Sequence, residues 1–260
     1  MAYLTRYRTG SFRVDLSAAD AAEVTLDGAT LEELGCWPTS IELAPATATV
    51  STASVPGRHG SVDLTLEDGT GGAYLTNRTL TIGIATDASW GETLADVKPA
   101  IGAFMGRVVE VWASPLGGTM EGRCAVGQWD DSRGASACTL TFDVGPMVSG
   151  DAVEVELAEG ANAVEVSGNR PALAVYTLTA TDGATSISVY DGEGHTLEYS
   201  PGASITATVT IDCDAQAVYA GSSLVAPTVE SDYPVLLPGA ATVTLTNCTG
   251  ALTYVPQTLI

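Results

Sequence analysis

Basic residues are scarce in this sequence: Lys and Arg number 10 against 31 Asp and Glu, and the formal net charge is −21. Nine bases precede residue 150 and only Arg170 follows it, while the acids split 18 and 13, so the halves carry 9 − 18 = −9 and 1 − 13 = −12. A nucleic-acid-binding protein needs basic surface to contact phosphates. The composition therefore argues against nucleic-acid binding and against attraction to an anionic membrane, and the acidity is best explained by solubility.

Long apolar segments are also lacking. Residues 1–20 contain no apolar core of a signal peptide. No run approaches the ~20 apolar residues that span a bilayer. We therefore expect synthesis in the cytoplasm of the producing cell, no export by a standard signal and no membrane insertion.

Cysteine usage gives no sign of a disulfide or zinc framework, because the number is odd and no CxxC spacing occurs. We expect buried reduced thiols that pack as small hydrophobic groups. Two pairs, Cys124 with Cys138 and Cys213 with Cys248, are candidate cross-strand neighbours.

Catalytic motifs are missing as well. The only histidines are His59 and His195, and no HExxH, GxSxG, P-loop or GxGxxG motif is present. Asp212 and Asp214 flank a cysteine, but such a run fits a strand end entering a turn better than a metal site. We expect no catalytic residue, no cofactor and no metal ion.

What the sequence does contain is typical of a mainly β protein with two β-sandwich-like domains. We expect a first domain at residues 1–148, with one short helix near 93–105 and a protruding arm or hairpin. A second domain at 151–260 shows short apolar strands and turns every 8–12 residues, the spacing of a β-sandwich. Strands are expected there at 152–157, 163–166, 172–180, 186–190, 195–198, 204–210, 216–219, 241–246 and 251–255.

The stretch from Pro56 to Ile84 contains two runs of alternating apolar residues, at 61–66 and 79–85, around a Gly-rich loop. This pattern predicts a hairpin with a long loop. Residues 47–54 are polar and extended with little to bury. They would be a poor strand in a closed monomer, but in an assembly they could form a projecting arm that a neighbour covers.

The best helix candidate is Trp90–Met105, where apolar residues recur at three- and four-residue spacing. Thr93 is a candidate N-cap, with Asp96 three residues later. Pro99 disfavours a long helix, or it marks a helix that starts at Lys98.

The first strand region, residues 1–16, is the most basic part of the chain. Arg6, Arg8 and Arg13 allow two interpretations. The charges protect a solvated edge strand from unwanted pairing, or they contact an acidic neighbour such as another copy.

The order of several short motifs resembles the distal tail proteins of long, non-contractile-tailed bacteriophages and prophages. In the first half they are PGRHGSVDL, YLTNR, GRVVEVW, EGRCAV and a closing Gly145-Pro146. In the second half they are ITATVTIDCDAQAVY and SDYPVLLPGAATVTL. The resemblance covers most of residues 55–260, and the order of the motifs carries it.

The resemblance implies a structural virion protein at the tail tip, assembled in the bacterial host cytoplasm. Six copies would form a ring hub that joins the tail tube and the tape-measure end to the tail-associated tip protein. A galectin-like second domain would project outward and in some relatives holds a receptor-binding protein. We expect the following residues at the subunit interface: Arg6, Arg8, Arg13, Arg58, His59, Tyr74, Asn77, Arg78 and Arg107.

Two other classes of function remain open. A tandem β-sandwich adhesin or carbohydrate-binding module would recognise host glycan, although the second domain has no Trp and only tyrosines as stacking platforms. An enzyme such as a cell-wall hydrolase would need an acid–base pair that forms only on folding. For the ring hub, an acidic channel lining that repels DNA phosphates is a further hypothesis.

Overall fold

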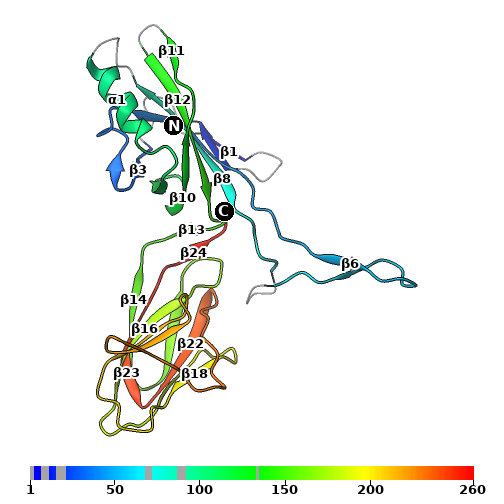
Figure 1. Cartoon of the computed structure of the whole chain (residues 1–260), viewed down its shortest axis with the longest axis vertical. Helices are drawn as coiled ribbons and strands as arrows, with labels where there is room; N and C mark the ends of the chain where they lie inside the picture. The colour runs from blue at the N-terminus through cyan, green and yellow to red at the C-terminus, as the bar shows by residue number, and fades with distance from the viewer. Residues whose placement is uncertain (1–2, 7–11, 16–21, 68–71, 87–91, 133–134) are drawn as a thin grey trace. The chain divides into compact units, whose positions relative to one another are not determined.

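Figure 1 shows the computed structural model of the chain, which describes residues 3–6, 12–15, 22–67, 72–86, 92–132 and 135–260. Its strands are labelled β1 to β24, and they fall into two compact units. The first unit runs as far as Val148, apart from residues 69–72, and includes Leu259–Ile260. The second unit comprises Ser149–Thr258.

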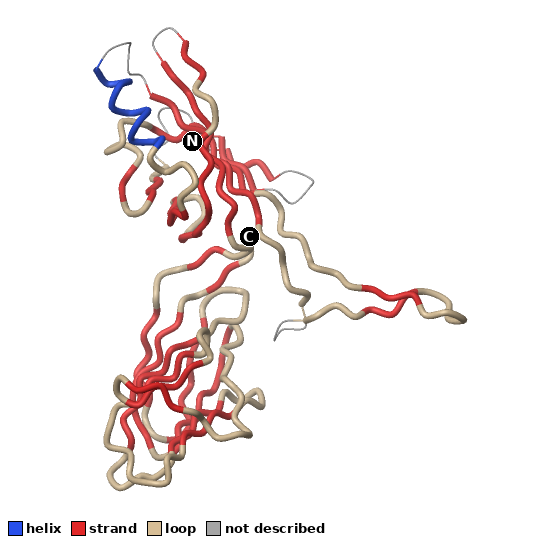
Figure 2. Tube along the Cα trace, viewed as in Figure 1, coloured by secondary structure: helices blue, strands red, loops and turns tan. Residues whose placement is uncertain are grey.

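The strands of the first unit, red in Figure 2, form an antiparallel sheet. Its strand order is β1-β2-β5-β8-β12-β10-β9-β3-β4, and β11 pairs with β12. The longest pairing joins β8 to β12. It runs from Arg78, which lies opposite Val144, to Thr86, which lies opposite Ser136. The strand bounds are β1 Tyr3–Arg6, β2 Phe12–Asp15, β3 Val24–Leu26, β4 Ala29–Thr30, β5 Trp37–Leu43, β6 Thr52–Ser54, β7 Ser61–Asp63, β8 Arg78–Thr86, β9 Val108–Ala113, β10 Gly118–Val126, β11 Asp130–Ser132 and β12 Ala135–Val144.

The helix α1 spans Glu92–Gly102 and is the only helix among the residues that the structure describes. Val97 and Ile101, four residues apart on one helix face, are buried in the same core as the sheet. The prediction of one short helix is therefore confirmed. Its details differ. Thr93 lies inside the helix rather than at its N-cap, and Pro99 lies in the second half of the helix, so the helix does not start at Lys98.

The predicted hairpin between 61–66 and 79–85 is wrong. The first run contributes β7, which pairs with β6, whereas β8 pairs with β5 and β12. Leu80 and Ile82 are fully buried, but Leu66 is 76% exposed. The alternating pattern predicts a strand in each run, but only the strand of the second run packs apolar side chains into the core.

Two antiparallel sheets form the second unit, with the strand orders β14-β23-β16-β19-β20-β21 and β15-β22-β17-β18. Two-residue strands, β13 and β24, pair with each other. The bounds are β13 Val148–Ser149, β14 Val153–Leu157, β15 Gly160–Val166, β16 Ala174–Ala180, β17 Ile187–Tyr190, β18 Thr196–Tyr199, β19 Val209–Asp212, β20 Ala217–Ala220, β21 Ser223–Val225, β22 Gly239–Thr246, β23 Cys248–Tyr254 and β24 Gln257–Thr258.

One apolar core lies between these two sheets. Tyr176 and Leu252 enter it from the larger sheet, and Val189 and Val243 enter it from the smaller one. All four are fully or almost fully buried. The mainly β fold with a sandwich-like second unit is therefore confirmed, while the galectin-like detail stays a prediction.

Strand positions in the second unit follow the predicted spacing with two differences. The strand expected at 204–210 begins only at Val209, since the N–H of Ile205 bonds to the carbonyl of Ala184 outside any strand. A short strand at Ser223–Val225 was not expected, and its Leu224 is 69% exposed.

All five cysteines are buried free thiols, as the sequence predicts. Neither proposed cross-strand pair forms. The register of β10 with β12 places Cys124 opposite Phe142, not opposite Cys138. The N–H of Cys213 bonds to the carbonyl of Ala174 in β16. The buried cysteines are Cys36, Cys124, Cys138, Cys213 and Cys248.

Candidate functional site

A two-stranded arm, defined here as residues 44–67 and 73–77, leaves the sheet of the first unit between β5 and β8 (Figure 1). Its strands are held together by the β6–β7 pairing and by bonds such as that from the N–H of Thr49 to the carbonyl of Tyr74, 2.7 Å. No described residue of the arm is buried. An isolated two-stranded ribbon is marginally stable in water, so the arm gains order from whatever it contacts.

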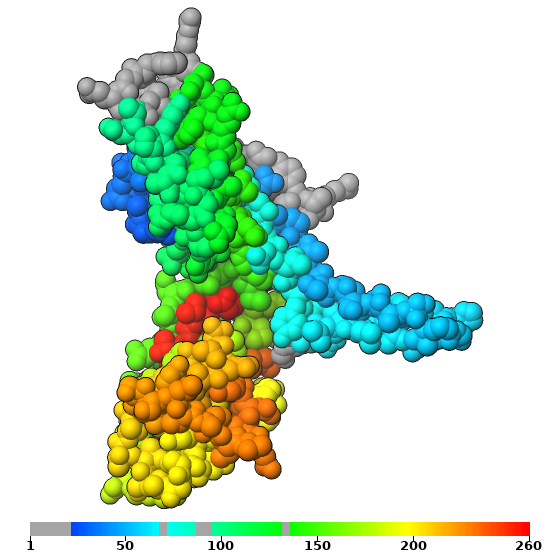
Figure 3. Space-filling view, in the orientation of Figure 1, coloured from blue at the N-terminus to red at the C-terminus, as the bar shows by residue number. Residues whose placement is uncertain are grey.

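One face of the arm is apolar. The register of β6 with β7 pairs Ala53 with Val62. Because side chains alternate along a strand, Leu64 and Leu66 follow Val62 on this face. They are 56% and 76% exposed. The space-filling view shows the outer part of the arm as a narrow ribbon (Figure 3). The arm is thus an amphipathic ribbon with an open apolar face.

The tip of the arm carries its positive charge. Gly57 and Gly60 take positive φ angles of 82° and 81°, which glycine adopts without a steric penalty. Between them lie Arg58 and His59, both exposed. Among the residues whose side chains the structure describes, neither has an ion-pair partner. The predicted turn therefore displays a cation at the end of the ribbon.

The other expected interface residues occupy three settings. Tyr74, which is 57% exposed, and Asn77 lie on the arm. Arg107 is exposed in the body of the first unit, where its Nη2 lies 3.1 Å from the carboxylate of Asp27. The arginines near the N-terminus lie in β1 (Arg6), in β2 (Arg13) and outside the described residues (Arg8).

Arg78 corrects the expected set, because it is buried at 2% exposure. It begins β8 where the arm rejoins the sheet. Its Nε donates to the carbonyl of Ala44 (2.7 Å), its Nη1 to that of Pro146 (3.1 Å) and its Nη2 to that of Ile260 (3.1 Å). Burial lowers the pKa of the guanidinium. Arg78 therefore clamps three segments of its own unit.

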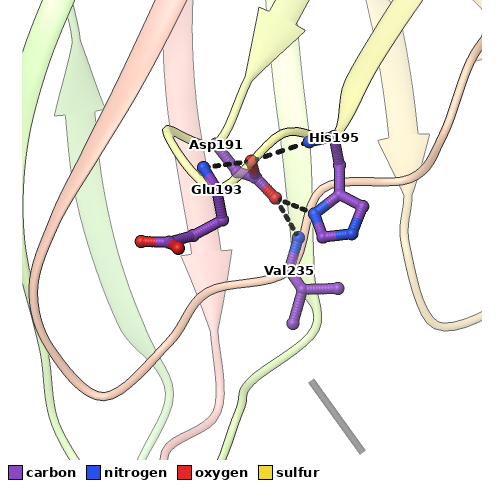
Figure 4. Close-up of polar contacts among 4 residues, drawn as sticks. All are labelled: Asp191, Glu193, His195 and Val235. Atoms are coloured by element: carbon purple, nitrogen blue, oxygen red, sulfur yellow. Dashed lines mark hydrogen bonds and ion pairs between the residues drawn. The ribbon is translucent and has the colours of Figure 1, made fainter. Parts of the chain in front are cut away.

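A buried carboxylate organises one end of the smaller sheet in the second unit (Figure 4). The side chain of Asp191 is 0% exposed. One oxygen accepts from the backbone N–H of Glu193 (2.8 Å) and His195 (3.1 Å); the other accepts from that of Val235 (3.2 Å) and lies 2.5 Å from Nδ1 of His195. Burial alone would raise the pKa of Asp191, but these hydrogen bonds outweigh it and lower the pKa below its usual range.

The Asp191 cluster fixes the segment that covers an edge strand. This segment, residues 226–238, donates the N–H of Thr228 to the carbonyl of Glu198 in β18 (2.8 Å). Val235, further along it, is tied to Asp191. Covering an exposed edge protects a sheet from pairing with other chains. The sequence signal for the partner of His195 is an Asp four residues earlier, across a Gly-rich turn.

The polar groups around Asp191 and Asp212 hold turns in place. Within the described ranges, no group of three or more His, Cys, Asp and Glu side chains could hold a metal ion. Oδ1 of Asp212 accepts the N–H groups of Asp214 (3.1 Å) and Ala215 (2.9 Å), which is the turn that the sequence predicts. In the part of the chain that the structure describes, no helix has the length and apolarity needed to cross a membrane.

The tyrosines of the second unit offer little stacking surface. Tyr176 and Tyr254 are almost completely buried, and Tyr199 is 8% exposed. Tyr190, at 39%, is an exposed ring of this unit. Glycan-binding sandwiches need exposed aromatic faces, so this distribution gives the adhesin interpretation no specific support.

Comparison with known proteins agrees with the sequence motifs. Residues 167–257 match the family model described as the C-terminal domain of siphovirus-type tail components. A crystal structure of the Dit protein of phage SPP1, whose title calls it a paradigm of the hub adsorption apparatus of phages infecting Gram-positive bacteria, has the same fold. Its TM-score is 0.72 at 16% identity, over 92% of this chain and 99% of that chain. The resemblance to distal tail proteins is therefore confirmed.

Other comparisons are more distant. Chains in two structures of the activated baseplate of phage p2, one with strontium and one with calcium, give TM-scores of 0.42 and 0.41. Each has 10% identity and covers 91% of this chain and 98% of that chain. A search of curated protein sequences finds no significant match.

Proposed function

We propose that this chain is a distal tail protein with a structural, non-enzymatic role, because residues 167–257 match the model of the C-terminal domain of siphovirus-type tail components. Six copies form a ring hub at the tip of a phage tail. The single observation that carries this proposal is that match, supported by a shared fold across both units.

The first unit has the features that ring formation needs. Rings are built from heterologous contacts, in which one surface of a subunit meets a different surface of the next. The arm supplies a projecting surface with an open apolar face, and Arg58 places a cation at its tip. Such an element is unfavourable in an isolated monomer and favourable in an assembly.

The partners follow from a hub's position in a tail. One side of the ring meets the tail tube and the end of the tape-measure protein, and the other meets the tail-associated tip protein. The second unit is available to a receptor-binding protein. The finished particle, with this chain at the tail tip, is assembled in the bacterial cytoplasm.

Negative-stain electron microscopy with light scattering on the concentrated protein tests the ring. We expect six-fold rings with an open centre at about six times the mass of the 26.5 kDa chain. A protein that stays monomeric and binds glycans on an array would overturn the hub in favour of an adhesin. Hydrolysis of purified cell walls would overturn the non-enzymatic assignment.

A further inference from the structure

We propose that Arg78 couples the base of the arm to the two segments through which the chain enters and leaves the second unit. A change that loosens or orders one of these segments then loosens or orders the base of the arm as well. The coupling belongs to a single copy of the chain and requires no ring, so this inference goes beyond the proposed hub role.

The base of the arm, residues 44–49 and 73–77, is fastened to the sheet at Ala44. The N–H of Ala44 donates to the carbonyl of Thr79 (2.9 Å), and its own carbonyl accepts from Nε of Arg78 (2.7 Å). No described residue of the arm is buried, so the arm has no core of its own. The hydrogen bonds at its base therefore decide how well the arm is ordered.

Arg78 also holds both segments that carry the chain between the units. Its Nη1 donates to the carbonyl of Pro146 and its Nη2 to that of Ile260, each at 3.1 Å. Ser149 follows Pro146 by three residues, and Gln257 precedes Ile260 by three. The side-chain amide of Gln257 donates to the hydroxyl oxygen of Ser149 (3.3 Å). The two segments are thus joined to each other at one end and to a single guanidinium at the other.

The guanidinium can couple three segments because it is buried and planar. Arg78 is 2% exposed, so water cannot readily replace an acceptor that moves away, and an unsatisfied buried donor is costly. The N–H groups of a guanidinium point in fixed directions within one plane. A shift of one acceptor therefore tilts the plane and weakens the bonds to the other two. The three segments keep their positions together or lose them together.

A glycine in the second unit gives access to one of these segments from a distance. The carbonyl of Gln257 accepts the N–H groups of Asn169 (3.0 Å) and Arg170 (3.2 Å). Gly168 precedes them with a φ of 97°, and a Cβ there would lie 2.5 Å from the carbonyl oxygen of Gln257. G168A must therefore displace Gln257, and Ile260 lies only three residues further along the chain.

Hydrogen exchange at the base of the arm tests the coupling in the monomeric protein. The amides of Ala44 and Thr76 are hydrogen-bonded, and G168A should speed their exchange by about fivefold, a small factor for coupled sites. G183A is the matched control, because Gly183 also has a positive φ (78°) in the second unit but a Cβ there meets nothing within 4 Å. Unchanged exchange at the base in G168A, with faster exchange at Asn169, would overturn the coupling. An equal rise in G183A would overturn it too.

Replacing Arg78 tests whether the guanidinium is the route. R78K keeps the positive charge but replaces the planar fork by a point charge, which cannot hold three separate carbonyls. It should speed exchange at the base of the arm by about fivefold or more. The same increase is expected at Gly150, whose N–H donates to the carbonyl of Pro256 in the connecting segments (2.9 Å). G168A added to R78K should cause no further change in the arm.

L140A is the control for a general loss of stability. Leu140 is buried in the same sheet opposite Ile82 and takes no part in the clamp, so L140A should leave exchange at the base of the arm and at Gly150 unchanged. A further rise in the R78K/G168A double variant would show that the coupling bypasses Arg78 and would overturn the proposal. These measurements use the monomer, so their outcome leaves the ring hub to be decided by electron microscopy.

Discussion

The guanidinium of Arg78 donates a hydrogen bond of 3.1 Å to the carbonyl oxygen of Ile260. This bond links the first residue of β8 to the last residue of the sequence, and it explains a division within the final ten residues. Residues 251–254 complete β23 in the second unit, whereas Leu259–Ile260 belong to the first unit. The expected second domain at 151–260 therefore loses its last two residues to the first unit.

Replacing Arg78 tests the clamp. R78Q loses at least one of three hydrogen bonds from a buried group and leaves carbonyls unsatisfied, so we expect about 2–4 kcal/mol lower stability. The four tryptophans all lie before residue 130, and their fluorescence during urea unfolding therefore reports on the first unit. R58Q, at the exposed arm tip, is the control and should unfold like the wild type. An unchanged midpoint for R78Q would show that the clamp contributes no stability.

Asp191 gives the second unit a predictable dependence on pH. D191N should destabilise it by about 2–3 kcal/mol near neutral pH, since an amide replaces a carboxylate that accepts from three backbone N–H groups. The folded-state pKa of Asp191 is lowered. Its contribution is therefore complete above the unfolded pKa of about 3.9 and is lost as the pH falls through the folded value.

Calorimetry of the wild type and D191N between pH 7 and pH 3 measures this dependence. The gap between their unfolding free energies should stay constant down to about pH 5 and narrow below about pH 4. H195Q retains Asp191 and its backbone donors, so it should cost less than D191N. A gap that widens on acidification would contradict the assigned ionisation state.

Two glycines should respond in opposite directions to alanine. A Cβ at Gly250 in β23 would lie 2.1 Å from the carbonyl oxygen of Thr177, so G250A must displace backbone and should cost about 2 kcal/mol or more. A Cβ at Gly102, the last residue of α1, meets nothing within 4 Å. G102A should stabilise the protein by about 0.5–1 kcal/mol. Thermal unfolding of both variants tests these opposite effects, and equal melting temperatures for G250A and G102A would contradict them.

The thiols should resist modification in the native state. Burial raises the pKa of Cys36, Cys124 and Cys248 to about 11 and that of Cys213 to about 12. At pH 8 the reactive thiolate is therefore rare and enclosed. We expect no reaction with a thiol-specific chromogenic reagent in buffer and five reacting thiols in guanidinium. Rapid labelling of the folded protein would reveal local opening.

Local patterns predicted the elements of this fold well. Alternation identified β8 and most strands of the second unit, and the spacing of Val97 and Ile101 identified α1. These features depend on neighbours in the sequence. The motif order also predicted a resemblance to distal tail proteins, and the family-model match over residues 167–257 agrees with it.

The sequence did not predict the features that depend on contacts between residues far apart in the chain. Arg78 looked like a surface arginine, because its three carbonyl acceptors come from Ala44, Pro146 and Ile260. The alternation of Leu64 and Leu66 predicted a strand that pairs with 79–85, but both side chains are exposed, because alternation does not distinguish a face that packs within the chain from one that is open. The interface residues expected from the sequence stay predictions, and Arg78 among them is buried in its own unit.

The lack of a core in the arm changes how substitutions there would be noticed. Since no described residue of the arm is buried, its side chains contribute little to the folding of their own subunit. A variant library sorted by thermal stability or soluble yield would score most arm positions as neutral. The same library sorted by particle formation would find them sensitive, and the difference between the two scores would map the contact without a structure of the assembly.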